Sequence, residues 1–244
     1  MEDQDVSVSS LLKTRPPKAL HATAMRYRKS VVAIMVTDDD GMSYGSGFIL
    51  RGGPGGSLVV TCEHIVREAT SIRVRRVVGV GEGGGVEDYA ATMICKHREP
   101  DIALLRVPDL IQPSLALNLA VPQVGLNYPA ISVGNACPAD GPGGNWDGST
   151  LVRLPSTLPG CIWYAFASLS TYDDKVKLVM YETLFLNCET VGGMSGGPIV
   201  GAQGVIGMGC KMSDDGLLML AVSSSTIIQV LKLTAGLHVD VIRD

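Results

Sequence analysis

The segment YGSGFILRGGPGGSLVVT, residues 44–61, shows a clear strand–turn–strand pattern. Two apolar runs, residues 44–50 and 57–61, flank a turn made of glycine and proline. Runs rich in β-branched and aromatic residues on either side of such a turn are typical of a hairpin. The turn has no Lys-Ser or Lys-Thr pair, so it does not match a phosphate-binding loop. These residues therefore predict antiparallel β-structure.

The same pattern continues over most of the chain and predicts an all-β fold. Short runs rich in valine and isoleucine alternate with glycine, proline and aspartate, which favours a sandwich or a barrel. The predicted strands are residues 31–36, 44–50, 57–61, 71–78, 90–95, 102–107, 130–133, 160–168, 177–185, 198–200, 205–210 and 217–222.

Two segments depart from the strand pattern, one at each end of the chain. Residues 1–29 are polar and basic and predict an N-terminal extension outside the core, with a helix-compatible stretch through Leu20 and Ala24. Near the other end, serines 223–225 could cap a segment whose apolar residues, from Ile227 to Leu233, recur at helical spacing. The sequence therefore predicts a C-terminal helix.

The composition excludes several classes of protein. Of 244 residues, 46% are hydrophobic and 18% are charged, which is typical of a chain that folds around a core. A net charge of -4 gives no general attraction for nucleic acid. The longest apolar runs, of six residues, are too short for membrane insertion. The acidic start lacks an apolar signal segment, which predicts an intracellular protein of the cytoplasm or nucleus.

Neither a metal site nor a nucleotide site is indicated by the sequence. The cysteines form no C-x-x-C pair, so we expect mostly buried free thiols rather than zinc ligands or a disulfide framework. They are Cys62, Cys95, Cys137, Cys161, Cys188 and Cys210. Residues 79–84 match the G-x-G-x-x-G pattern of dinucleotide-binding loops, but a strand is predicted to follow instead of the required helix.

Three polar residues stand where the strand pattern could hold them rigidly. His64 comes shortly after a predicted strand, and Asp101 comes directly before one. Ser195 lies in the turn GGMSGGP, where backbone N–H groups can crowd together because glycine has no side chain. A base, a carboxylate that orients it and a hydroxyl nucleophile are the groups that acyl transfer requires. We therefore predict that these residues form one site. Glu99 and Asp88 are the alternatives to Asp101.

The order His, Asp, Ser on an all-β chain resembles the trypsin/chymotrypsin clan of serine proteases. The resemblance rests on three segments, VTCEHIV at 60–66, DIALLRV at 101–107 and GMSGGP at 193–198. Two further segments, GSGFIL at 45–50 and LAVSSSTI at 220–227, are closer to the HtrA/Deg subgroup.

The resemblance implies two packed six-stranded β-barrels of the trypsin type and a C-terminal helix. It places a trypsin-like peptidase domain at residues 30–225, with the first barrel at about 30–120 and the second at about 121–225. A helix and tail would occupy residues 226–244. HtrA/Deg proteins form trimers through N-terminal segments, a role that residues 1–29 could fill.

The resemblance also assigns roles within the cleft between the barrels. The N–H groups of Gly193 and Ser195 would form the oxyanion hole, and a protein or peptide substrate would bind beside them. The 49 residues after Ser195 leave no room for the peptide-binding PDZ module that many HtrA/Deg proteins carry.

The primary specificity pocket follows from alignment on Ser195. Its floor would be Glu189, and its wall would be formed by Gly207, Met208 and Gly209. A carboxylate at the floor would favour Lys or Arg before the scissile bond, through a charge-assisted contact. The alternative is that Glu189 lies on a surface loop, because carboxylates are rarely buried without a partner.

Three residues depart from the clan. Met194 replaces the aspartate that pairs with a freed N-terminal amine in trypsin-like enzymes, so activation by cleavage is not expected. Glu63 stands where a small or neutral residue is common, and we expect it to point to solvent. Cys62 is either a redox-sensitive thiol or a buried strand cysteine.

Two functions are compatible with these residues. The first is a serine endopeptidase that uses His64, Asp101 and Ser195 through an acyl-enzyme, with no metal and no organic cofactor. The second is a protease-like module that binds extended peptides by strand addition, with weak turnover or none. Neither function calls for nucleic acid or membrane insertion.

Overall fold

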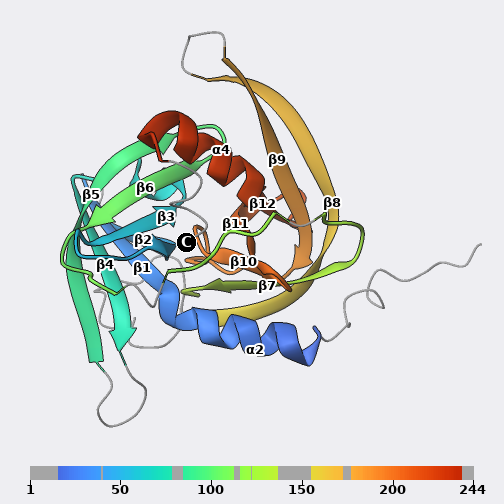
Figure 1. Ribbon diagram of the computed structural model, residues 1–244, viewed down its shortest axis with the longest axis horizontal. Helices are drawn as coiled ribbons and strands as arrows, with labels where there is room; N and C mark the ends of the chain where they lie inside the picture. The colour runs from blue at the N-terminus through green and yellow to red at the C-terminus, as the bar shows by residue number, and fades with distance from the viewer. Residues whose placement is uncertain are drawn as a thin grey trace, which may run out of the picture.

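The computed structural model contains two closed antiparallel β-barrels that pack side by side (Figure 1). This confirms the predicted trypsin-like architecture. The structure describes residues 16–39, 41–78, 85–112, 116–121, 123–136, 155–172 and 177–237. Cys137 and the glycine-rich segment 79–84, to which the sequence analysis referred, lie outside these ranges.

The first barrel consists of six strands in the order β1-β2-β3-β6-β5-β4. Their bounds are β1 Val31–Asp38, β2 Gly41–Arg51, β3 Ser57–Thr61, β4 Ser71–Val78, β5 Gly85–His97 and β6 Ile102–Val107. β3 and β6 are neighbours, although β4 and β5 lie between them in sequence. Because the pair is antiparallel, the end of β3 and the beginning of β6 meet at the same edge of the barrel.

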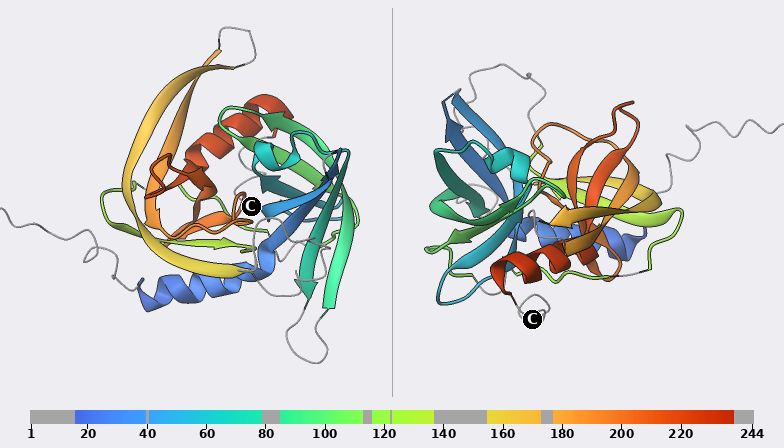
Figure 2. Two further views of the ribbon diagram at one scale, coloured as in Figure 1. Left: turned by 180° about the vertical axis from the view of Figure 1, so that it is seen from behind. Right: turned by 90° about the horizontal axis from the view of Figure 1, so that it is seen from above.

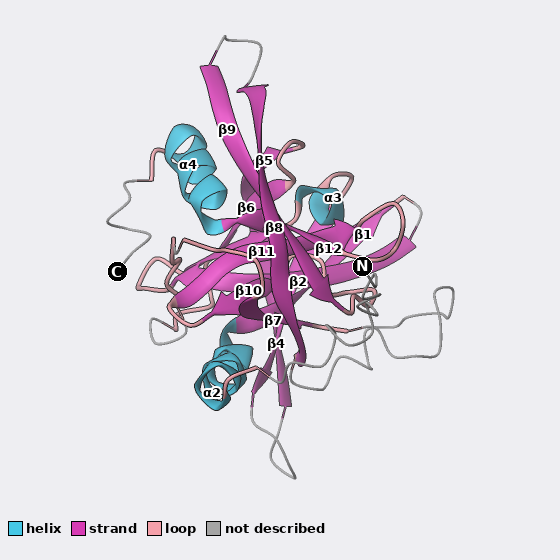
Figure 3. Cartoon of the chain, turned by 90° about the vertical axis from the view of Figure 1, so that its right-hand side faces the viewer, coloured by secondary structure: helices cyan, strands magenta, loops and turns pink. Residues whose placement is uncertain are grey.

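The second barrel also has six strands, in the order β10-β11-β12-β9-β8-β7. Their bounds are β7 Tyr128–Gly134, β8 Ser156–Tyr172, β9 Lys177–Cys188, β10 Pro198–Gly201, β11 Gly204–Met212 and β12 Met219–Ser223. The hairpin of β8 and β9 is longer than the sequence predicted and extends beyond the barrel (Figures 1 and 3). On it, the rings of Tyr164 and Phe185 stack with their centroids 4.3 Å apart.

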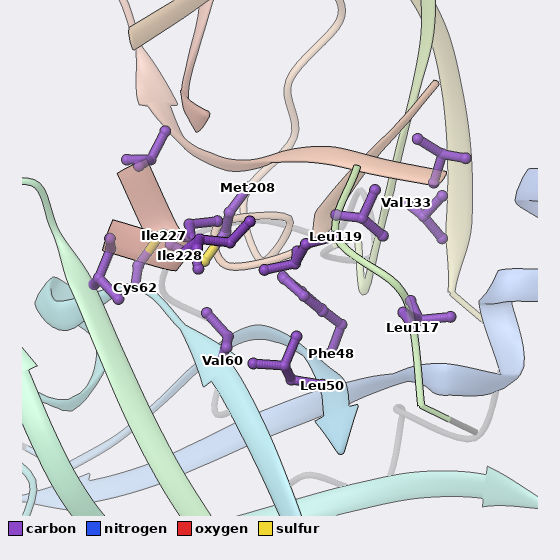
Figure 4. Close-up of a cluster of buried hydrophobic side chains, with 14 of the residues drawn as sticks. Phe48, Leu50, Val60, Cys62, Leu117, Leu119, Val133, Met208, Ile227 and Ile228 are labelled. Carbon is purple, nitrogen blue, oxygen red and sulfur yellow. The ribbon is translucent and has the colours of Figure 1, made fainter. Parts of the chain in front are cut away.

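Apolar side chains from both barrels form a shared core. Phe48 and Val60 of the first barrel belong to the same buried cluster as Met208 of the second (Figure 4). Each barrel also has a smaller cluster of its own. Burial of apolar surface at this junction stabilises the pair of barrels as one unit.

Helix α2, Lys18–Tyr27, precedes the first barrel and packs against β7 and β10 of the second. Its side chains Leu20 and Ala24 are buried in the shared core. The prediction that this stretch lies outside the core was therefore wrong. One face of the helix is apolar, and the second barrel covers this face and shields it from solvent.

Helix α4, Ser224–Ala235, closes the fold at the C-terminal side. It begins at residue 224, slightly earlier than predicted, because Ser223 is the N-cap and its hydroxyl accepts from the N–H of Thr226. The helix packs on β11, β12 and β9 of the second barrel and on β5 of the first (Figure 2). Among the described residues, no helix combines the length and apolarity that crossing a membrane requires.

Candidate active site

His64 lies in a single helical turn, α3 Glu63–Val66, that follows β3. β3 pairs with β2 on one side and with β6 on the other, so the strand that leads to His64 is fixed along both edges. The imidazole itself is 38% exposed. A rigid backbone thus presents a ring that solvent can reach.

Asp101 holds His64 at two points. Its Oδ1 accepts from the backbone N–H of His64 at 2.9 Å. Its Oδ2 lies 2.8 Å from Nδ1 of the ring. A carboxylate can only accept, so Nδ1 carries the proton and Nε2 is left with a free lone pair. This is the tautomer that a general base needs.

The backbone brings Asp101 to this place in an uncommon conformation. Its φ is +65°, in the left-handed region that non-glycine residues seldom adopt. Asp101 immediately precedes β6, whose first residues pair with the end of β3. The predicted pairing of His64 with Asp101 is therefore present, and the neighbouring strand ends account for it.

Asp88, one of the two alternatives to Asp101, has other partners. Its Oδ1 and Oδ2 accept from the guanidinium of Arg75 at 2.6 and 2.7 Å. The same hydrogen bond lowers the pKa of Asp88 below its ordinary value. Asp88 therefore belongs to the β4–β5 surface rather than to His64.

Ser195 lies in the turn between β9 and β10 and is partly exposed. Its Oγ donates to the backbone carbonyl of Cys210 on β11, at 2.7 Å. Within the described parts of the chain, no hydrogen bond joins Ser195 to His64. Proton transfer to the imidazole therefore requires the hydroxyl to turn away from Cys210.

One carbonyl links the serine turn to the histidine segment. The Gly209 oxygen accepts from the N–H of Gly196, the residue after Ser195, at 2.7 Å. It also accepts from the thiol of Cys62, two residues before His64, at 3.4 Å. The two segments therefore converge at the junction of the barrels, as the sequence analysis expected.

The turn around Ser195 needs glycine at Gly193 because its backbone is closely packed. Gly193 has a φ of +84°, and a Cβ built on it would meet the Asn135 carbonyl oxygen at 2.3 Å and the Tyr44 ring at 2.6 Å. Across the described residues, the N–H groups of Gly193 and Ser195 donate to no backbone carbonyl. These two donors are the ones predicted for the oxyanion hole.

Ser46 on β2 was not singled out by the sequence analysis, yet it clamps the serine turn. Its Oγ donates to the Gly193 carbonyl at 2.7 Å and accepts from the Asn135 N–H at 2.7 Å. Its own N–H donates to the carbonyl of Ser195 at 2.7 Å. Only its place between Gly45 and Gly47 could have drawn attention to it.

Replacing Ser46 by alanine should destabilise the protein by about 2–3 kcal/mol, because buried polar groups left without a partner typically cost about 1–3 kcal/mol. It should also slow any reaction at Ser195, since Gly193 loses its support. Chemical denaturation and rates of covalent labelling of Ser195 measure the two effects. Ser57→Ala is the control: this buried hydroxyl bonds the Leu110 carbonyl, away from the turn. Equal labelling rates in both variants would contradict the clamp.

The predicted pocket residues come from two segments of the second barrel. Glu189 directly follows β9 and is exposed. Gly207 and Gly209 are on β11, and the side chain of Met208 between them is fully buried in the shared core. Strand alternation accounts for this, because neighbouring residues face opposite sides. Met208 can therefore contribute to a pocket wall only through its backbone.

Glu63 does not point to solvent, and that prediction was wrong. The residue is 3% exposed, and the guanidinium of Arg67, one turn later, donates to its carboxylate at 2.7 to 3.2 Å. The pair lies at i,i+4 spacing, where side chains on one helical face meet. The hydrogen bond with Glu63 raises the pKa of Arg67 above its ordinary value.

The cysteines of the described ranges are free, as predicted. Cys62 is fully buried, and burial raises the pKa of its thiol well above the ordinary value. The thiol of Cys210 lies beside it and raises that pKa further. A high pKa and full burial both slow the oxidation of a thiol, which favours the buried strand cysteine over the redox-sensitive one.

Two closed six-stranded barrels with a C-terminal helix define the trypsin-like fold. The sequence profile of the trypsin-like peptidase domain family matches residues 45–208, more than half of the chain. The chain therefore belongs to this family. No curated protein sequence matches it.

Solved structures of proteases share the fold at low sequence identity. The Rv3671c protease of M. tuberculosis in its active form is 19% identical, with a TM-score of 0.66 over 91% of this chain and 88% of that one. The HtrA-type protease AlgW with a tripeptide is 19% identical, with a TM-score of 0.62 over 90% and 65%. A serine endoprotease from Yersinia pestis is 16% identical, with a TM-score of 0.61 over 94% and 69%.

Proposed function

We propose that the chain is a serine endopeptidase of the HtrA-like type, in which Ser195 is the nucleophile and His64 the general base. The observation that carries the proposal is the double hold of Asp101 on His64, through the backbone N–H and ring Nδ1. An ordinary surface histidine needs neither contact. Both contacts together fix the ring and its tautomer, as a general base requires.

In the proposed reaction, the Ser195 hydroxyl first turns from the Cys210 carbonyl toward Nε2 of His64. Side-chain rotamers at exposed positions exchange within nanoseconds, so this rotation of the Ser195 side chain does not limit the rate of the reaction. Oγ then attacks the peptide carbonyl while Nε2 takes its proton, and the N–H groups of Gly193 and Ser195 stabilise the oxyanion. His64 returns the proton to the leaving amine, and water hydrolyses the acyl-enzyme.

A second candidate is the peptide-binding module with little or no turnover. One observation favours it: the hydroxyl of Ser195 donates to Cys210 and not to His64. If the turn is locked in this state, peptide can bind while the nucleophile stays inactive.

Covalent labelling by a fluorophosphonate probe separates these functions. The endopeptidase predicts that folded wild-type protein takes up one probe, because the probe reacts only with an activated serine. Ser195→Ala should take up none, and Ser57→Ala should still react. Folded wild-type protein that remains unlabelled would support the binding module, and labelling of Ser195→Ala would exclude Ser195 as the nucleophile.

We further propose that Glu189 selects Lys or Arg before the scissile bond. Glu189→Gln keeps the size of the side chain and removes its charge. It should lower kcat/KM for peptides cleaved after Lys or Arg by about 10- to 100-fold, the loss typical of a charge-assisted hydrogen bond. Peptides with small aliphatic residues at that position supply the internal control. A wild-type preference for small aliphatic residues would remove this role.

Assembly as a trimer through the N-terminal segment also stays a prediction. The helix α2 part of that segment is packed against the second barrel. Analytical ultracentrifugation of the full chain, and of the chain lacking residues 1–15, would test the prediction.

A further inference from the structure

The proposed mechanism makes no use of Cys62, although its thiol lies directly behind the His64–Asp101 pair. One donor atom from each of Cys62, His64 and Asp101 lies within 4.8 Å of the other two. Cys62 is fully buried, at the edge of the shared core near Ile227 and Ile228 (Figure 4). The side chains of His64 and Asp101 are 38% and 23% exposed. The thiol is therefore closed to solvent, whereas the imidazole and the carboxylate are open to it.

Sulfur, imidazole nitrogen and carboxylate oxygen are together the donor set that zinc uses in proteins. With bonds of about 2.3 Å to sulfur and about 2.0 Å to nitrogen at a tetrahedral angle, two ligands of one zinc ion lie about 3.5 Å apart. The donor atoms lie within 4.8 Å of one another, so the partly exposed side chains of His64 and Asp101 must move toward Cys62 by about 1 Å to bind one ion. Magnesium and calcium prefer oxygen ligands, so the thiol selects against them.

A second thiol lies beside these three side chains and offers another soft sulfur donor. Cys210 is 7% exposed, and its side chain lies next to that of Cys62. Its backbone carbonyl is the acceptor of the Ser195 hydroxyl. An ion bound to Cys62 would therefore lie close to Cys210, the residue whose carbonyl accepts from the Ser195 hydroxyl.

We propose that Cys62, His64 and Asp101 form a binding site for a thiol-preferring divalent cation such as Zn²⁺, and that the bound ion inhibits the reaction of Ser195. The inhibition rests on the proposed function, whereas the binding does not. The ion would be an inhibitor and not a cofactor of the peptidase.

The inhibition follows from the proton balance of the ring. When the ion takes the lone pair of Nδ1, the single proton of neutral His64 moves to Nε2. The Cys62 thiol releases its proton to solvent as the thiolate binds the ion. Nε2 then carries a hydrogen and can only donate, so it cannot accept the proton of Ser195. Asp101 loses its hydrogen bond from Nδ1 and binds the ion as the third ligand.

Cobalt absorption tests binding without any need for activity. Co²⁺ should bind the wild-type protein at one ion per chain and give sulfur-to-metal charge-transfer and tetrahedral ligand-field bands, which Zn²⁺ abolishes by displacement. Cys62→Ala should remove the charge-transfer band. His64→Ala should weaken binding by at least about 100-fold, since even a partner behind a metal ligand is worth about 10- to 100-fold.

Controls and outcomes distinguish failure of the site from failure of the proposed function. Cys95→Ala, a half-buried cysteine of β5, should keep both bands. His64 is exposed, so its variant remains informative if Cys62→Ala does not fold. Absence of the charge-transfer band, or a band that persists in Cys62→Ala, would overturn the site. If Co²⁺ binds here but Zn²⁺ leaves fluorophosphonate labelling of wild-type protein unchanged, the inhibition is overturned while both site and peptidase stand.

Discussion

Asp101→Asn is expected to lower kcat about 10⁴-fold, the loss associated with a histidine held in the wrong tautomer. Asparagine can keep one contact, because its Oδ1 can still accept from the backbone N–H of His64. Its amide nitrogen would then face Nδ1 of the ring and donate to it. Nδ1 becomes the acceptor, the ring proton moves to Nε2, and His64 no longer accepts the proton of Ser195.

The measurement is kcat for a peptide substrate, together with the rate of fluorophosphonate labelling. Asp88→Asn is the matched control, because Asp88 pairs with Arg75 and does not touch His64. That variant should keep nearly all of the activity. Thermal unfolding of both variants shows whether a loss comes from the site or from the fold. Activity of Asp101→Asn within tenfold of wild type would contradict the role of Asp101.

Gly196→Ala is expected to destabilise the protein by at least about 4 kcal/mol, an unusually large value for one methyl group. A Cβ at this position would lie 2.0 Å from the Ser46 carbonyl oxygen and 2.7 Å from Oγ1 of Thr61. Both belong to strands of the first barrel, so neither can move without disturbing the barrel. The φ of +85° adds strain for any side chain.

Two other glycines separate the causes of this effect. Gly216 has a φ of +71° but open space around a Cβ, so Gly216→Ala should cost only the strain, about 1–2 kcal/mol. Gly55 has open space and no positive φ, so Gly55→Ala should change the stability little. Urea unfolding monitored by circular dichroism gives the three values. A Gly196→Ala variant as stable as Gly216→Ala would show that the turn can open without cost.

The strands were predictable because their signal is local. Most of the apolar runs are short and are bounded by residues typical of turns, such as glycine, proline and aspartate, and the observed strands overlap every predicted run. The lengths were less predictable. β8 and β9 continue past their predicted ends because they pair with each other, and the partner strand rather than composition supports the extra residues.

Part of the site was also predictable, for a different reason. The chain has only 4 histidines, so there are few candidates for a general base. The order of His64, Asp101 and Ser195 matches the order of base, orienting carboxylate and nucleophile in a known family. Ser46 is an ordinary strand serine by every local measure. Its importance arises from bonds to Gly193 and Asn135, which are distant in the sequence.

The amino-acid sequence alone determined which segments become strands and which residue types could carry acyl-transfer chemistry, because both depend on neighbours a few positions away. Three features became known only from the packed structure: Glu63 is buried against Arg67, Leu20 lies in the core, and the Ser195 hydroxyl donates to the Cys210 carbonyl. These features depend on which surfaces meet when two barrels close and pack. The spacing of apolar residues along the chain does not show which surfaces of the two barrels come into contact.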